Sequence, residues 1–125
     1  MVDINQNIKL YKIEKNKKQL VFNERGLVDI FPASTKIKIE TEDLFFELEL
    51  KRNELYLLRK AQDIVTEGIF HLQKKTRLVV ASEMGEAMFE VETLSYELLK
   101  NHANFEYELF ASNESAGRFQ FEVQF

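Results

Sequence analysis

Phe119 to Phe125 read Phe-Gln-Phe-Glu-Val-Gln-Phe, so every second residue of this stretch is apolar. A β-strand points successive side chains to opposite faces, and a period of two therefore marks a strand with one buried and one solvated face. The same alternation recurs in four further stretches, which are Thr35–Glu40, Phe46–Lys51, Phe89–Glu92 and Phe105–Leu109. The sequence predicts a single antiparallel β-domain over residues 1–125.

Short strands separated by short turns are predicted along the whole chain. They are expected at Ile8–Glu14, Gln19–Phe22, Leu27–Phe31, Thr35–Glu40, Leu44–Lys51, Glu54–Arg59, Ile64–Leu72, Thr76–Ala81, Glu86–Leu94, Phe105–Phe110 and Arg118–Phe125. The first turn falls at residues 15–18, and the second and third strands can form one strand bent at Gly26. This pattern is typical of a sandwich or barrel, and we predict an all-β antiparallel barrel of about eight to ten strands.

Two stretches also fit a helix, and they keep an α+β fold open as the alternative. Apolar residues recur at helical spacing between Asn53 and Thr66, among residues that form helices well. Residues from Val91 to about Lys100 are also compatible with a helix. The alternative fold is an antiparallel sheet covered by one or two helices.

The composition indicates a globular protein with a large apolar interior. The chain has 11 Phe and no Trp, its hydrophobic content is 45%, and its net charge is −4. A mildly acidic chain is not attracted as a whole to DNA or to an anionic membrane. The first residues lack the basic and apolar regions of a signal peptide, and no apolar run is long enough to span a bilayer, so we expect a cytoplasmic protein. The chain contains no Cys and therefore has no disulfide or thiol chemistry.

The chain from about Thr35 to Phe125 resembles the YwiB-like family of small bacterial proteins. Four short motifs carry the resemblance, namely Thr35-Lys36-Ile37, Arg59 at the end of a strand, the turn Ser82-Glu83-Met84-Gly85, and Thr93 on the following strand. The chain departs from the family pattern at Lys60-Ala61, where the family has a residue followed by Gly, and at Ser82-Glu83-Met84, where it has Thr-Pro-Tyr. The resemblance implies a calycin-like, lipocalin-like β-barrel without an established function, in which both helix-like stretches are strands.

Candidate ligand-binding residues come from the strand pattern and from this resemblance. Arg59 ends the apolar strand that begins at Leu55, and the family pattern also has an Arg there. Thr93 shares the phase of Phe89 and Val91, so it is expected to point inward. His71 lies in an apolar context and can face the interior, and Thr35 opens the first family motif. An inward Arg must be paired with a carboxylate or an anionic ligand, and the alternatives for Arg59 are an internal Glu67 or Glu83, or solvent at the rim.

Other motifs give no catalytic or metal site. The alternating carboxylates are opposite in phase to the apolar residues and are expected on the solvated exterior, at Glu47, Glu49, Glu90, Glu92, Glu106 and Glu108. His71 and His102 have no neighbouring ligands at the spacing of a zinc site. A nucleophile elbow and a Gly-rich phosphate loop are both missing from the sequence. We therefore expect no cofactor, no metal and no catalytic activity.

Two functions remain open at this level. The first is a non-catalytic barrel that binds a small apolar or anionic molecule, because a closed barrel of this size can hold one small ligand. The alternative is a protein- or RNA-interaction module that acts from its outer surface, since lysines crowd the first hairpin, at Lys9, Lys12, Lys15, Lys17 and Lys18. Phe residues fill cores and line pockets alike, so the sequence does not separate a hollow barrel from a filled one. The predicted buried face consists of Phe46, Leu48, Leu50, Phe89, Val91, Phe105, Tyr107, Phe119, Phe121 and Val123.

Overall fold

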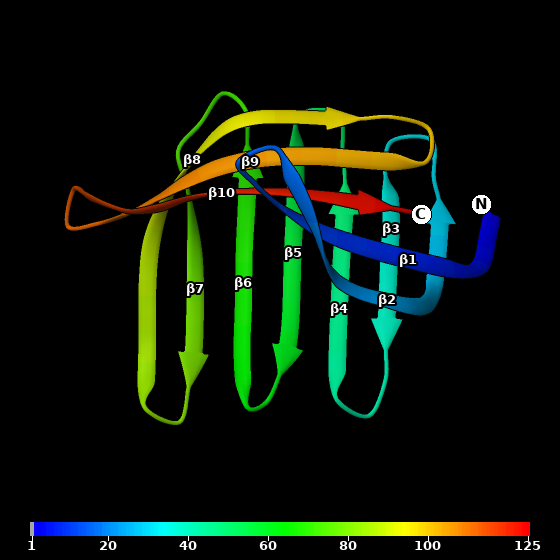
Figure 1. The fold of residues 1–125 in the computed structure, drawn as a ribbon, viewed down its shortest axis with the longest axis horizontal. Helices are drawn as coiled ribbons and strands as arrows, with labels where there is room; N and C mark the ends of the chain where they lie inside the picture. Colours follow the sequence, from blue (N-terminus) through cyan, green and yellow to red (C-terminus); the bar gives the residue numbers. More distant parts are fainter. Residues whose placement is uncertain (1) are drawn as a thin grey trace.

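The computed structural model describes residues 2–125, and Met1 lies outside the described residues. These residues form a closed antiparallel barrel of ten strands (Figure 1). The strands are β1 (Val2–Glu14), β2 (Lys17–Ile30), β3 (Thr35–Glu40), β4 (Leu44–Leu50), β5 (Glu54–Ala61), β6 (Ile64–His71), β7 (Thr76–Ser82), β8 (Gly85–Leu98), β9 (His102–Ala111) and β10 (Glu114–Gln124). Each strand pairs with the next along the chain, and β1 pairs with β10 to close the barrel. The predicted all-β barrel is confirmed.

The barrel is flattened into two layers whose strands cross (Figure 1). Strands β3 to β7 lie side by side in one layer, and β9, β10 and β1 run across them in the other. The long strands β2 and β8 curve from one layer into the other, so they form the corners of the barrel. Register shifts lie between Leu10 and Tyr11 in the β1–β2 pair and between Thr93 and Ser95 in the β8–β9 pair, and such bulges increase the local bend of a strand.

Alternating side chains fill the space between the two layers. Phe46, Leu48 and Leu50 of β4 are buried, whereas the intervening Glu47 and Glu49 lie on the opposite face. Phe70 is the largest fully buried side chain, and its ring centroid lies 4.6 Å from that of Tyr107 and 5.7 Å from that of Phe105. Contacts between such rings strengthen a core beyond the area that they bury. The predicted buried face is confirmed in orientation, although Phe89, Phe119 and Phe121 pack against the core while partly exposed.

Both helix-like stretches are strands, so the α+β alternative is wrong. The first forms β5 and β6 around the two-residue turn Gln62-Asp63, and the second continues β8 to Leu98. The apolar residues of β5 lie on two faces, because Leu55 is buried in the interior whereas Leu58 has the opposite phase. Pairing with β4 and β6 satisfies the backbone of this segment, which overrides its helix propensity. Across residues 2–125, the structure contains no helix that is long and apolar enough to cross a membrane.

Several strands are longer than the local alternation predicts, and β9, which begins at His102 rather than at Phe105, is one of them. β1 begins at Val2 rather than at Ile8, β2 is one continuous strand, and β8 ends at Leu98 rather than at Leu94. The long hairpin of β1 and β2 pairs from Val2 and Ile30 to Glu14 and Lys17. Backbone hydrogen bonds between strands form whether or not the side chains alternate between apolar and polar. The sequence pattern therefore underestimates the length of these strands.

Two-residue turns connect several of the strands. Lys15-Asn16, Gln62-Asp63 and Ser112-Asn113 each have positive φ at both residues, between 49° and 67°, which is the geometry of a type I′ turn. This turn matches the right-handed twist of the flanking strands. The first turn is therefore shorter than the four residues predicted, because Lys17 and Lys18 already belong to β2.

Gly85 and Gly117 have φ angles of 124° and 135°, as the sequence pattern predicts for turns or bulges. We expect Gly117→Val to reduce the free energy of unfolding by roughly 1–3 kcal/mol, because residues with a Cβ rarely adopt this backbone conformation. A Cβ at this position would also lie 3.0 Å from the Phe119 ring. Gly85→Val, where nothing lies within 4 Å of the added atom, measures the backbone effect alone. Unchanged urea midpoints for both variants would contradict the prediction.

Phe105 and Phe121 provide a test of how fully the interior is packed. Phe105 is buried and contacts Phe70, Tyr107 and Phe121, so we expect Phe105→Ala to cost about 3–5 kcal/mol in unfolding free energy. Phe121→Ala should cost less, because this residue is partly exposed. Urea unfolding of the two variants measures both values. An equal, small loss would mean that the interior is loosely filled.

Candidate functional site

The predicted ligand residues Arg59 and Thr35 lie toward opposite ends of the barrel. Arg59 pairs with Phe46 in β4 and with Thr66 in β6, so it has the inward phase, but it lies near the open end and is exposed. Thr35 pairs with Leu50 at the far end of β4. Of the alternatives for Arg59, a position at the rim agrees with the structure. Glu67 points outward and accepts a hydrogen bond from the Tyr56 hydroxyl at 3.0 Å.

Thr93 is buried in the interior, as its phase predicts, with 7% of its surface exposed. Its Oγ1 has no hydrogen-bond partner within the described residues. Thr93 pairs with Tyr107 of β9, and burial raises the pKa of the Tyr107 hydroxyl to about 12. This part of the barrel is therefore a dry, aromatic environment in which a charged group is disfavoured.

His71 does not face the interior. It follows the buried Phe70 in β6 and therefore has the outward phase. Its Nδ1 accepts a hydrogen bond from the backbone N–H of Gln73 at 3.1 Å, which stabilises the turn after β6. The structure therefore does not bring Arg59, Thr93, Thr35 and His71 together into one site.

A cavity of about 710 Å³ lies at the open end of the barrel, where Arg59 is found. We call it the mouth cavity. It is lined by Val21, Phe22, Glu42, Asp43, Leu44, Arg59, Ala61, Gln62, Asp63, Ile64 and Thr66. Phe22 packs edge-on against Phe46, with 5.0 Å between ring centroids, and Phe46 is buried. The mouth cavity thus lies over the filled interior and does not continue through the barrel.

The charges of the mouth cavity are uneven. Arg59 is the cationic side chain that lines it, whereas Glu42, Asp43 and Asp63 contribute carboxylates from the loops. Within residues 2–125, Arg59 forms no ion pair with any of them. A guanidinium available on an apolar wall can hydrogen-bond a carboxylate or carbonyl group, while the three carboxylates repel a polyanion.

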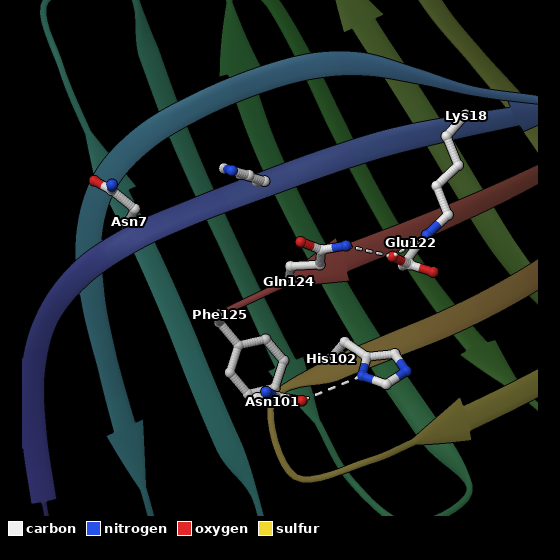
Figure 2. Close-up of a pocket in the computed structure, with 8 residues that line it drawn as sticks. Asn7, Lys18, Asn101, His102, Glu122, Gln124 and Phe125 are labelled. Carbon is white, nitrogen blue, oxygen red and sulfur yellow. Dashed lines mark hydrogen bonds and ion pairs between the residues drawn. The ribbon is translucent and has the colours of Figure 1, made fainter.

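A second cavity, of about 480 Å³, lies on the outer face of β1, β9 and β10 (Figure 2). We call it the outer groove. It is lined by Asn7, Lys9, Lys18, Asn101, His102, Glu122, Gln124 and Phe125. Figure 2 shows Glu122 and Gln124 on β10 beside His102 of β9. Charged and amide side chains dominate this groove, whereas five of the eleven residues that line the mouth cavity are apolar.

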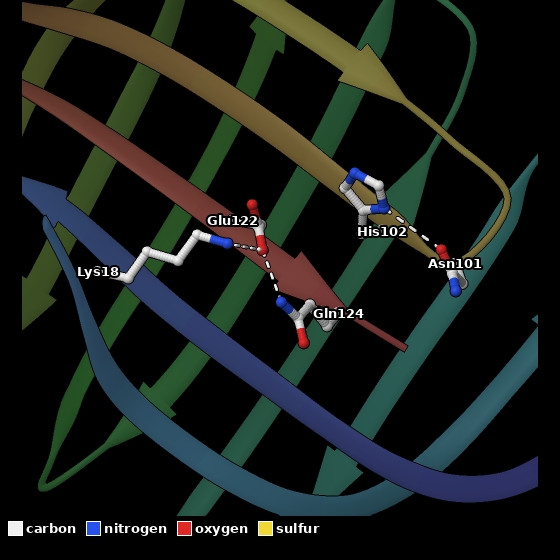
Figure 3. A network of polar contacts seen from close by, with 5 residues as sticks. All are labelled: Lys18, Asn101, His102, Glu122 and Gln124. Carbon is white, nitrogen blue, oxygen red and sulfur yellow. Dashed lines mark hydrogen bonds and ion pairs between the residues drawn. The ribbon is translucent and has the colours of Figure 1, made fainter. Parts of the chain in front are cut away.

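Glu122 is buried although it points away from the barrel interior, with only 7% of its surface exposed. It lies between Tyr11 of β1 and Asn104 of β9 in the strand register. Lys18 reaches across β1 to Glu122, and its Nζ lies 5.6 Å from the Tyr11 ring centroid and 2.9 Å from Oε2 of Glu122 (Figure 3). Nε2 of Gln124 donates to the same oxygen at 2.7 Å. The cover formed by neighbouring strands therefore shields most of this carboxylate from water.

Hydrogen bonds decide the ionisation of Glu122. Burial alone would raise its pKa. Hydrogen bonds from Gln124 and Lys18 lower the pKa and outweigh that effect, together with the electrostatic attraction of Lys18 and His102. The pKa of Glu122 therefore lies below its ordinary value, and the group is a carboxylate at neutral pH.

Sequence reasoning missed this site. Alternation places Glu122 on the outward face, where a carboxylate is ordinarily solvated. The groove also requires Lys18, which is 104 residues away along the chain. The only local signal is the outward polar series Gln120, Glu122 and Gln124. Within the described residues, no group of three or more His, Asp or Glu side chains is arranged to hold a metal ion.

The chain matches the family described as "Domain of unknown function (DUF1934)" over residues 3–123. It belongs to this family. No curated protein matches the chain. The crystal structure of the YwiB protein from Bacillus subtilis is similar, with a TM-score of 0.61 and 11% identity over 98% of this chain and 90% of that chain. The predicted resemblance to the YwiB-like family is confirmed, and at this identity the structural similarity shows the shared fold.

Because Glu122 is a buried carboxylate with a lowered pKa, we predict that the stability of this protein depends on pH. The folded-state pKa of Glu122 is lowered, so its stabilising effect is present above the unfolded value of 4.5 and is lost as the pH falls through the lower folded-state pKa. We expect Glu122→Gln to reduce the free energy of unfolding at neutral pH. The difference from wild type should shrink below pH 4.5. Urea unfolding across this range is the measurement, with the exposed Glu92→Gln as control. A difference that does not vary with pH would contradict the role of the charge.

Proposed function

We propose that this protein is a non-catalytic binding protein that takes a small, partly apolar molecule at the mouth cavity. The observation that carries the proposal is the combination of an accessible guanidinium and apolar walls in one cavity of about 710 Å³. This volume lies within the usual range for small-molecule sites, which are mostly apolar with a few convergent polar groups. Phe22, Leu44 and Ile64 provide apolar surface, and Arg59 and Thr66 provide hydrogen-bond donors.

The filled interior supports a ligand site at the rim rather than deep in the barrel. Side chains such as Phe70, Leu48 and Leu50 occupy the centre and are almost completely buried. A ligand that entered there would have to displace them, at a cost of several kcal/mol for each large side chain. The mouth cavity requires no such displacement, because it is lined by Phe22, which packs against the buried Phe46.

The charges restrict the chemistry of this ligand. One carboxylate or carbonyl group can pair with Arg59, but the carboxylates of Glu42, Asp43 and Asp63 oppose a molecule with several negative charges. The favoured ligand is therefore neutral or singly charged, with an apolar body. A medium-chain fatty acid or an aromatic carboxylate has these properties.

A thermal-shift screen on wild type and Arg59→Met tests the proposal. The screen contains fatty acids, small organic anions, neutral apolar molecules and nucleotides. A ligand at a hundred times its Kd should stabilise wild type by about 2.7 kcal/mol, and Arg59→Met should lose most of the stabilisation given by a carboxylate. Lys60→Met is the matched control, because Lys60 is the next residue of β5, exposed and of opposite phase.

Equal stabilisation of wild type and Arg59→Met by every hit would remove Arg59 from the site. The absence of any hit would favour the alternative, in which the protein acts from its outer surface as a protein- or RNA-interaction module. The exposed lysines of the first hairpin, Lys15, Lys17 and Lys18, support that alternative.

A further inference from the structure

The outer groove contains a buried carboxylate with one oxygen still available. Oε2 of Glu122 accepts hydrogen bonds from both Lys18 and Gln124, whereas Oε1 accepts none from the described part of the chain. Among the described residues, the only fully buried side-chain polar atom without a partner is Oγ1 of Thr93, in the barrel interior. Oε1 of Glu122 also lacks a partner, so it is not fully buried and is open to the groove that Glu122 lines. A carboxylate oxygen held in this way can accept a hydrogen bond from a hydroxyl or amine of a ligand.

The groove is positively charged although the protein is acidic. Lys9 and Lys18 line it together with Glu122, which leaves one net positive charge there while the whole chain carries −4. Lys9 forms no ion pair with any side chain of residues 5–125. Lys18 pairs with Glu122 through one of the three protons of its ammonium group. These lysines favour an anionic ligand and disfavour an ammonium group.

The remaining lining suits hydroxyl groups. Asn7, Asn101 and Gln124 carry amides that both donate and accept hydrogen bonds. The ring of His102 is oriented by a hydrogen bond between its Nδ1 and Oδ1 of Asn101, at 3.3 Å (Figure 3). The Phe125 ring adds an apolar surface at the same end of the groove (Figure 2). A ligand with an anionic group and several hydroxyls therefore matches the lysines and the hydrogen-bonding side chains of the groove.

We propose that the outer groove binds a sugar phosphate, either free or as the ribose phosphate of a nucleotide. The phosphate interacts with the ammonium groups of Lys9 and Lys18, which line the groove and compensate its charge. A sugar hydroxyl donates to Oε1 of Glu122, in the manner in which a carboxylate holds a ribose hydroxyl in nucleotide-binding folds. The volume of about 480 Å³ is within the usual range for a small-molecule site. This site is separate from the mouth cavity, whose carboxylates oppose a phosphate.

Isothermal titration calorimetry tests the site with ribose 5-phosphate, adenosine 5′-monophosphate, inorganic phosphate and ribose as probes. We expect wild type to bind ribose 5-phosphate at least about tenfold more tightly than either inorganic phosphate or ribose. Lys9→Met should weaken this binding at least about tenfold, and Lys17→Met, an exposed lysine of the same hairpin that does not line the groove, should not. Urea unfolding confirms that each variant is folded. Comparison of the two phosphorylated probes identifies the source, since a nucleotide site prefers the monophosphate.

Glu122→Gln provides the second variant. It should reduce the affinity for ribose 5-phosphate more than the affinity for inorganic phosphate, because the carboxylate contacts the sugar, whereas an effect transmitted through Lys18 would change both affinities by the same factor. A purely structural role for Glu122 would alter both affinities together or neither. Arg59→Met should leave all of these affinities unchanged, so the two proposals can fail separately.

Three results would overturn the sugar phosphate site. One is the absence of measurable binding of either phosphorylated probe at millimolar concentration. Another is equal affinity of wild type and Lys9→Met for ribose 5-phosphate. The third is binding of inorganic phosphate, or of an amino acid such as glycine, as tightly as ribose 5-phosphate.

Discussion

Pairing between the first and last strands is the constraint on which this barrel depends. β1 and β10 pair through residues 9–12 and 121–124, and this short ladder removes two open sheet edges at once. Lys18 strengthens it, because its side chain crosses β1 and bonds to Glu122 on β10, so that three strands are held together. Burying one partner of an ion pair has a desolvation cost, which the attraction between the two charges does not offset by itself. Here the hydrogen bond from Gln124 to Oε2 of Glu122 provides additional stabilisation of the carboxylate.

The same closure creates the outer groove. Tyr11 and Asn104 flank Glu122 only because β1 and β9 lie on either side of β10, and the tip of the first hairpin brings Lys18 over them. A structural contact and a polar cavity thus share one carboxylate, of which Oε2 is hydrogen-bonded to Lys18 and Gln124 while Oε1 has no partner among the described residues. This division allows a group that supports the fold to present a second atom to a ligand.

The two cavities differ because their positions relative to the filled interior differ. The mouth cavity includes the ends of inward-facing positions, so Phe22 and Leu44 give it an apolar wall and Arg59 its charge. The outer groove is built from outward-facing positions, so amides and lysines line it. A barrel with a packed centre can therefore carry cavities of opposite net charge, negative at the mouth cavity and positive at the outer groove.

The sequence by itself determined the strands and their faces, because the two-residue period is a local property of the extended chain. It oriented the predicted core residues, from Phe46 to Val123, and gave Arg59 and Thr93 the inward phase that the structure shows. It left open whether residues 53–66 form a helix, because only the partners β4 and β6 decide that. Tertiary structure alone decided which end of the barrel each residue occupies, that His71 serves a turn, and that an outward Glu122 is buried. Those properties depend on contacts between distant parts of the chain, such as Lys18 with Glu122, and no local pattern encodes them.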